Sequence, residues 1–443
     1  MSTATHGANA QQNGANAHNG ANAQLLDADA QLLDADAQLL SATAQLLKGD
    51  AQQKHLVGRD IVCFANDWSG DPLSKKHVMT RLAKHNRVLW VNSLGNRAPR
   101  ATARDLGRIV DKLKKLAAQL TTGPVKVAEN IYTITPLAVP NYKARWARAI
   151  NEITVGATVR GAMATLGFAD PLLYTFVPAS AWVARSLGCR HVVYHCVDEY
   201  AQFAGAGDDI AKLEAELIAK SDLVITCSTP LQHSKERLNA NTHLVRHGVE
   251  QHHFAQALDP ATEIPADVKD LPTPRFGFYG LVAEWVDLEA MAKVADAYPN
   301  GSVIIVGEHN NADKAGIAKL EAKPNVHFIG RKPYASLPGY CKAFDVALLP
   351  FVKNELTENA NPLKLREYLA AGLPVVSTDI PEAVAVADYG VFLADGADAF
   401  VTRVGEALAA GSGPDRARSN AMAHESWDAK VAEIETLVME LKS

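Results

Sequence analysis

From residue 60 onward, short apolar runs alternate with longer stretches in which apolar residues recur at helical spacing. The short runs predict buried strands, and the stretches between them predict helices. Strands that alternate with helices are typical of doubly wound parallel sheets. The predicted strands begin near residues 60, 87, 172, 191, 223, 275, 302, 326, 345, 374 and 391.

A Pro-rich polar link from Asp259 to Pro274 divides this pattern into two α/β sets. We therefore predict an N-terminal Rossmann-like domain at 55–255 and a C-terminal one at 270–425. Residues 426–443 predict an amphipathic helix that packs back on the N-terminal domain. Residues 1–54 are of low complexity and repeat AQLLDAD. Their heptad spacing is compatible with a short coiled coil, but a disordered tail is favoured because Asp and Ala support only a marginal helix.

Composition narrows the class of protein. Of 443 residues, 48% are hydrophobic and 21% charged, and the net charge of −5 argues against an electrostatic nucleic-acid binder. The five cysteines are scattered without a CxxC pair, which favours buried free thiols over a zinc site. No apolar run is long enough for a transmembrane helix, and no secretory signal is visible, so a cytoplasmic location is expected.

The stretch from Phe344 to Asp379 predicts a strand, a loop, a helix and a second strand in a parallel crossover. Asn361 is the predicted N-cap, Pro362 the first helical residue and Gly372 the C′ residue. Such a unit places the start of its helix at the carboxyl edge of the sheet, where open α/β sheets bind ligands.

Lys364 and Glu367 follow in this helix and share one face. A lysine among free N–H groups at a helix N-terminus suits an anion, and a carboxylate one turn on suits a pair of sugar hydroxyls. On spacing alone, a surface helix with an ordinary Lys and Glu is the favoured interpretation.

Further candidates follow other predicted strands. No GxGxxG follows the first strand, so a dinucleotide site is not supported. Glycines end several strands of the second half, where a ligand could approach the backbone. The candidates that follow strands in the first half are Ser74, Lys75, His77 and Asp198.

The most basic stretch runs from Arg97 to Gln119 and carries an apolar stripe at helical spacing. A basic amphipathic helix is typical of a membrane-surface element, although an ordinary surface helix fits as well. The basic residues that would face anionic lipid are Arg104, Arg108, Lys112 and Lys115.

Five motifs carry a resemblance to a known family. They are FGFYGLVAEWVD, FIGRKPYASLP and NPLKLREYLAAGLPVVSTD in the second half, and FANDWSGDPLSKKH and YHCVDEYAQFAG in the first. Together they resemble the GT-B retaining glycosyltransferases of family 4, nearest to the bacterial exopolysaccharide and teichuronic-acid type. This resemblance spans about residues 58–440. It implies a GT-B fold, in which two Rossmann-like doubly wound domains face a central cleft.

The resemblance also implies a cell-envelope role. A UDP- or GDP-linked nucleotide-sugar would be the co-substrate, without a separate cofactor or metal, and the acceptor would be a lipid-linked or other saccharide at the inner membrane face. The donor-binding residues would be Gly280, Gly307, Arg331, Lys364 and Glu367. Ser74, Lys75, His77 and Asp198 would face the acceptor, and no catalytic nucleophile is assigned.

The chain departs from the family pattern at three places, one of which is His195, where related sequences often have Asp. Asn359 stands where the family has a second glutamate, and Leu281 to Trp285 replace a basic donor loop. Two alternatives therefore stay open, a non-hydrolysing nucleotide-sugar epimerase and a catalytically silent GT-B scaffold subunit.

Overall fold

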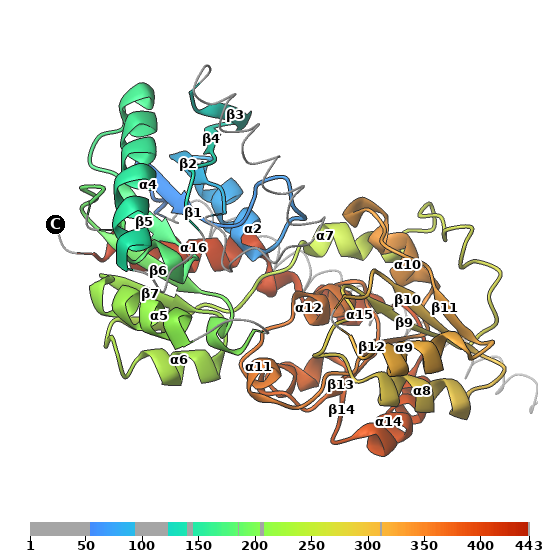
Figure 1. Cartoon of the computed structure of the whole chain (residues 1–443). Coiled ribbons are helices and arrows are strands. Elements are labelled where there is room, and N and C mark those ends of the chain that lie inside the picture. Colours follow the sequence, from blue (N-terminus) through green and yellow to red (C-terminus); the bar gives the residue numbers. More distant parts are fainter. Residues whose placement is uncertain are drawn as a thin grey trace, which may run out of the picture. The chain divides into compact units, whose positions relative to one another are not determined.

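A computed structural model describes residues 54–93, 123–139, 145–184, 186–203, 208–310 and 312–441. The N-terminal repeat and the basic stretch with Arg104, Arg108, Lys112 and Lys115 lie outside these residues. From Leu56 onward the chain forms one compact unit. Within it, two largely parallel sheets build two α/β domains (Figure 1), as the alternating pattern predicts.

The first sheet has β1 at its topological switch point, between β2 and β5. Its order is β3 (Val125–Ala128), β4 (Ile131–Ile134), β2 (Arg87–Val91), β1 (Asp60–Phe64), β5 (Leu172–Thr175), β6 (Val192–Cys196), β7 (Leu223–Thr226) and β8 (Thr242–Leu244). All pairs are parallel except β3 with β4. The sequence pattern did not predict β3, β4 or β8. The edge strand β3 is mostly exposed and carries no apolar run.

The second sheet has its switch point between β9 and β12. Its order is β11 (Val326–Phe328), β10 (Ser302–Val306), β9 (Arg275–Tyr279), β12 (Val346–Leu349), β13 (Val375–Thr378) and β14 (Val391–Ala394). β12 and β13 pair in parallel, which confirms the predicted crossover. Ligands of open α/β sheets bind beyond the carboxyl ends of the strands at such a switch point.

Helices cover both sheets (Figure 1). Those of the first half are α2 (Ser74–Leu82), α4 (Arg145–Leu166), α5 (Asp208–Lys220), α6 (Thr229–Lys235) and α7 (Gln251–Phe254). Those of the second half are α8 (Leu288–Ala297), α9 (Lys314–Glu321), α10 (Leu337–Ala343), α11 (Glu355–Glu358), α12 (Leu363–Ala370), α13 (Pro381–Val384), α14 (Ala397–Ala410), α15 (Arg416–Ala421) and α16 (Trp427–Met439).

The last helix, α16, belongs to the first domain by its packing. Ser426 caps its N-terminus by accepting a hydrogen bond from the Ala429 N–H. Its apolar face, with Trp427 and Ile434, joins the hydrophobic core of the first domain, next to α2. The chain therefore crosses between the domains twice.

Candidate functional site

A cleft of about 740 Å³ lies between the carboxyl edges of the two sheets. Both domains contribute its walls. The residues proposed for a donor and an acceptor that line it are Gly280, Gly307, Arg331, Lys364 and Glu367 from the second domain, and Ser74, Lys75 and Asp198 from the first. His77 is not among the lining residues.

The helix α12 carries Lys364 and Glu367 into this cleft. Gly372, with φ of +82°, ends the helix at C′, as predicted. Its N–H donates to the Leu369 carbonyl, and the Leu373 N–H donates to the Tyr368 carbonyl, which completes a Schellman motif. The N-terminus differs from the prediction, because Pro362 occupies the N-cap position and Asn361 precedes it without capping the helix.

Lys364 and Glu367 are held by aromatic side chains. The Lys364 ammonium lies 4.7 Å from the ring centre of Phe278 and 5.6 Å from that of Phe351. The Tyr279 hydroxyl donates a hydrogen bond of 2.8 Å to Glu367 Oε2. Burial lowers the pKa of Lys364 to about 8, against the opposing pull of Glu367. Burial likewise raises the pKa of Glu367 to about 7, although Tyr279 and Lys364 favour its charged form.

The two candidate glycines bring backbone close to this lysine. Gly280 follows β9 with φ of +124°, and a Cβ there would lie 2.8 Å from Lys364 Nζ. A Cβ on Gly307, at the end of β10, would overlap the Gly280 carbonyl oxygen. Both positions therefore require glycine, and they leave bare backbone beside the Lys364 ammonium.

Arg331 is engaged across the cleft. Its guanidinium forms an ion pair of 2.7 Å with Asp71 of the first domain, and both side chains are 59% exposed. Such an exposed pair contributes little to stability. A ligand with phosphate groups would compete with Asp71 for this arginine.

In the first domain, α2 and β6 place a lysine and a carboxylate on the facing wall. Lys75 Nζ donates to Asn66 Oδ1 and to the Tyr200 hydroxyl, each at 3.2 Å. Burial lowers its pKa, and the charge of Asp198 opposes this. Burial also raises the pKa of Asp198 to about 6, despite the nearby Lys75.

His77 has a different environment from the one expected of a cleft residue. Its Nδ1 lies 3.0 Å from Glu250 Oε1, and its ring stacks on Trp427 with centroids 5.0 Å apart. The side chain is 9% exposed. These contacts join α2 to α7 and α16, so His77 helps to pack the region where the chain crosses between the domains.

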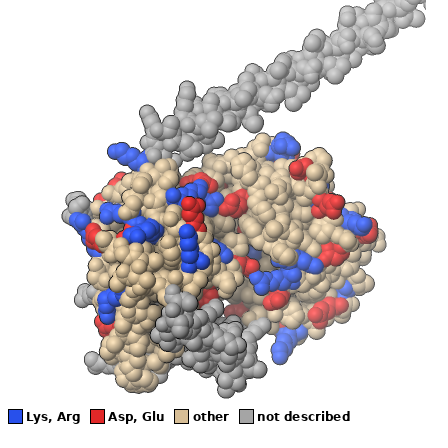
Figure 2. Space-filling view, turned by 90° about the horizontal axis from the view of Figure 1, so that it is seen from above, with Lys and Arg blue, Asp and Glu red and all other residues tan. Residues whose placement is uncertain are grey.

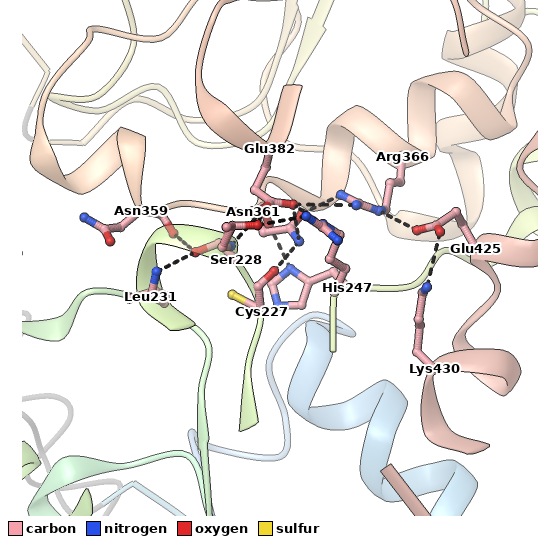
Figure 3. Close-up of polar contacts among 12 residues, drawn as sticks. Cys227, Ser228, Leu231, His247, Asn359, Asn361, Arg366, Glu382, Glu425 and Lys430 are labelled. Carbon is pink, nitrogen blue, oxygen red and sulfur yellow. Dashed lines mark hydrogen bonds and ion pairs between the residues drawn. The ribbon is translucent and has the colours of Figure 1, made fainter. Parts of the chain in front are cut away.

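A buried polar network joins the two domains beside the cleft (Figure 3). Glu382, at the start of α13, is fully buried. It accepts hydrogen bonds from the Thr229 N–H at 3.0 Å and from Arg246 Nε at 2.8 Å, both in the first domain. Asn361 donates to the Cys227 carbonyl, and its own carbonyl accepts a hydrogen bond of 2.8 Å from His247 Nδ1.

The same network continues toward the second crossing. The Arg366 side chain is fully buried, donates to Asn361 Oδ1 and lies 3.2 Å from Glu425 Oε2. Glu425 also accepts from Lys430 of α16 at 3.2 Å (Figure 3). Sequence reasoning missed Glu382 and Arg366, and the one available signal was an arginine on the apolar side of α12.

Asn359 stands where the family pattern has a glutamate, and its side chain does not face the cleft. Its side-chain Nδ2 donates 2.7 Å to the Glu355 carbonyl in α11, and it does not line the cleft. Its own carbonyl accepts a hydrogen bond of 2.7 Å from Ser228 Oγ. The segment before α12 is thus fixed to the first domain by its backbone.

Comparison with known proteins relates part of this chain to a known family. Residues 274–410 match the family model described as glycosyl transferases group 1. This match lies within the second domain. A putative teichuronic acid biosynthesis glycosyltransferase, TuaH, of Bacillus subtilis (strain 168) is 27% identical over 224 residues, which cover 47% of this chain. The match spans only 55% of that relative, about half its length.

Solved structures show that both domains together have the GT-B fold. Sucrose-phosphate synthase from Thermosynechococcus elongatus superposes with a TM-score of 0.61 at 16% identity, over 86% of this chain and 99% of that one. HepE from Anabaena in complex with UDP gives a TM-score of 0.56 at 14% identity, over 86% of this chain and 100% of that one. The GT-B architecture expected from the sequence motifs is confirmed.

Two further observations concern membrane spans and metal sites among the described residues. No helix in the described ranges is long and apolar enough to span a bilayer. Across those same ranges, no cluster of three or more His, Cys, Asp or Glu side chains is arranged to hold a metal ion. Figure 2 shows acidic and basic side chains interspersed over the face that it draws.

Proposed function

We propose that this protein transfers a sugar from a UDP- or GDP-linked donor to a saccharide acceptor. The observation that carries the proposal is the placement of Lys364 and Glu367 on the first turns of α12. Both face a cleft at the switch point of the domain that contains the group 1 glycosyl transferase match. HepE, which shares the fold, was solved with UDP and with UDP-glucose.

The diphosphate and the ribose of a nucleotide-sugar would each have a partner among these residues. The free N–H groups at the start of α12 and the Lys364 ammonium would bind the diphosphate, and bare backbone at Gly280 leaves room for it. Glu367, oriented by Tyr279, would accept hydrogen bonds from two ribose hydroxyls. The charged lysine also stabilises the negative charge that develops on the departing diphosphate.

The reaction breaks the bond between the anomeric carbon and the diphosphate oxygen. A new bond forms between that carbon and an acceptor hydroxyl oxygen, whose proton passes to the departing diphosphate. The motif resemblance supports retention of the anomeric configuration by departure and attack on one face. No protein nucleophile is required for that course.

Nucleotide binding tests the proposal most directly. A ligand that binds only the folded state stabilises it by RT ln(1 + [L]/Kd), about 2.7 kcal/mol at 100 Kd. UDP- or GDP-sugars should therefore raise the melting temperature of the protein. Lys364→Ala and Glu367→Ala should remove the shift, whereas Lys319→Ala, an exposed lysine on α9, should keep it. Equal shifts in all variants would exclude this site.

Turnover separates the proposal from its alternatives. Release of UDP or GDP that depends on an added saccharide supports transfer. Binding without any turnover favours a silent scaffold subunit, which the position of the Asn359 side chain would explain. Conversion of the donor sugar to its epimer without an acceptor favours an epimerase.

We also propose that the protein works at the cytoplasmic face of the membrane. Support comes from the basic amphipathic stretch of the sequence and from the cell-envelope type of the motifs. Each basic residue near anionic lipid contributes about 1 kcal/mol. Charge reversal at Arg104, Arg108, Lys112 and Lys115 should release the protein from phosphatidylglycerol vesicles in flotation. Unchanged flotation would contradict this location.

A further inference from the structure

The first turn of α2 in the first domain has hydrogen-bond donors without acceptors. Leu73 occupies the N-cap position, provides no side-chain cap, and no acidic residue lies in the first turn. The Leu73 carbonyl accepts from the N–H groups of Lys76 and His77. The N–H groups of Ser74 and Lys75 donate to no acceptor among the described residues. A helix N-terminus in this condition attracts anions.

Two side chains add to this feature. Ser74 is only 5% exposed, and its hydroxyl has no hydrogen-bond partner among the described residues, yet Ser74 lines the cleft. Polar groups on nearly buried residues usually have a partner in the protein. The Ser74 hydroxyl instead opens to the cleft, an observation independent of the helix end that points to a ligand.

Lys75 is a buried cation without a close counter-ion. It is 7% exposed and lines the same cleft. An ammonium has three N–H donors, and Lys75 uses two of them on the neutral groups of Asn66 and Tyr200. In the part of the chain that the structure describes, no carboxylate oxygen lies within 4.0 Å of its ammonium nitrogen. Burying a charge is costly unless a partner compensates for it.

Acidic side chains on this wall do not form an ion pair with Lys75. Asp198 acts on Lys75 electrostatically but forms no ion pair with it. Asp71 also lines the cleft, and its carboxylate is bound to Arg331. An incoming anion would thus be the first group to pair closely with Lys75.

The cleft therefore has two walls of similar design. α12 presents Lys364 from the second domain, and α2 presents Ser74 and Lys75 from the first. We propose that the α2 turn binds a carboxylate or phosphate group on the acceptor, so that the protein glycosylates an anionic saccharide. This inference rests on the proposed function, in which the α12 wall holds the donor diphosphate.

The test uses the full-length protein and three probes: methyl glucuronide, glucose 6-phosphate and the neutral methyl glucoside. Each is titrated by calorimetry, with and without saturating UDP. We expect the carboxylate or the phosphate probe to bind, and the neutral probe to bind at least about tenfold more weakly, since charge-assisted hydrogen bonds supply the difference. Comparison of the two anionic probes identifies which group the site takes.

Variants assign the binding to the α2 turn. Lys75→Met keeps the length of the side chain and should weaken binding of the anionic probe about tenfold or more. Ser74→Ala removes only a hydroxyl and should weaken it less, which provides a second test if Lys75→Met folds poorly. Lys76→Met is the matched control, because Lys76 bonds to carbonyls of the loop before α2 and does not line the cleft.

Three results would overturn the proposal. Equal affinity for the neutral and anionic probes would show that the site does not recognise the anionic group. Unchanged affinity in both Lys75→Met and Ser74→Ala would show that the α2 turn does not bind the probe. A loss of UDP affinity in Lys75→Met as large as in Lys364→Ala would assign the turn to the donor diphosphate. Failure of every nucleotide to bind contradicts the proposed function instead, and the probes without UDP still report on the α2 turn.

Discussion

Glu382 provides the sharpest test of how the two domains are joined. Its carboxylate is fully buried and accepts hydrogen bonds from Thr229 N–H and Arg246 Nε of the other domain. Glu382→Ala leaves an unpaired N–H at the start of α6 and an arginine without its carboxylate. Breaking a buried pair on one side costs about 3–5 kcal/mol. The Arg246 side chain is 31% exposed and can turn to water, so we expect a loss of about 3 kcal/mol, at the lower end.

Urea unfolding followed by tryptophan fluorescence measures this loss as a lower midpoint. A domain is stable by about 5–15 kcal/mol, so the expected loss is a large share of it. Glu382→Gln keeps the shape and one acceptor oxygen and should fall between wild type and Glu382→Ala. Glu321→Ala, an exposed glutamate at the end of α9, is the matched control and should stay within about 0.5 kcal/mol of wild type. Equal midpoints for Glu382→Ala and Glu321→Ala would refute the reasoning.

Three further outcomes follow from the site and its surroundings. Nucleotide-sugar affinity should be highest between about pH 7 and 8, because Glu367 gains a proton below its pKa of about 7 and Lys364 loses one above about 8; a flat profile from pH 6 to 9 in calorimetry would contradict this. Gly307→Ala should abolish nucleotide binding and lower the melting temperature, since its Cβ overlaps the Gly280 carbonyl, and an unchanged thermogram would rule that out. Trp427→Ala, at a site 2% exposed in the core of the first domain, should cost about 3–5 kcal/mol in urea unfolding, and a loss below about 1 kcal/mol would show that α16 does not anchor that core.

Most strands that are buried on both faces followed from local patterns, although β4, a largely buried strand, was not predicted. The runs beginning at Asp60, Arg275 and Ser302 became β1, β9 and β10, because a central parallel strand must be apolar along its whole length. The edge strand β3 has the exposed pattern of a loop, and it forms only because β4 offers free backbone groups. No local signal could reveal that pairing.

The site was predictable to the extent that it depends on one helix. Lys364 and Glu367 share a face by helical spacing, and Gly372 ends the helix, so these positions followed from the local sequence. Asn361 did not, because its local role as a cap competes with long-range bonds to Cys227 and His247 in the other domain. When a side chain can bond either to a helix end or to a distant carbonyl, tertiary contacts alone decide which bond forms.

The two connections between the domains differ in chemistry, and this difference has a physical consequence. At the cleft, the contacts are polar: the buried Ser228 hydroxyl donates to the Asn359 carbonyl, and the exposed Arg331 pairs with Asp71, where water can replace both partners. At the second crossing, Trp427 is buried in an apolar core, and exposing it would forfeit its transfer free energy. Polar boundaries are typical of domains that move relative to each other, whereas apolar ones fix their partners. The α16 helix should therefore stay with the first domain while the polar boundary opens, and ligands that contact both walls of the cleft would hold that boundary closed.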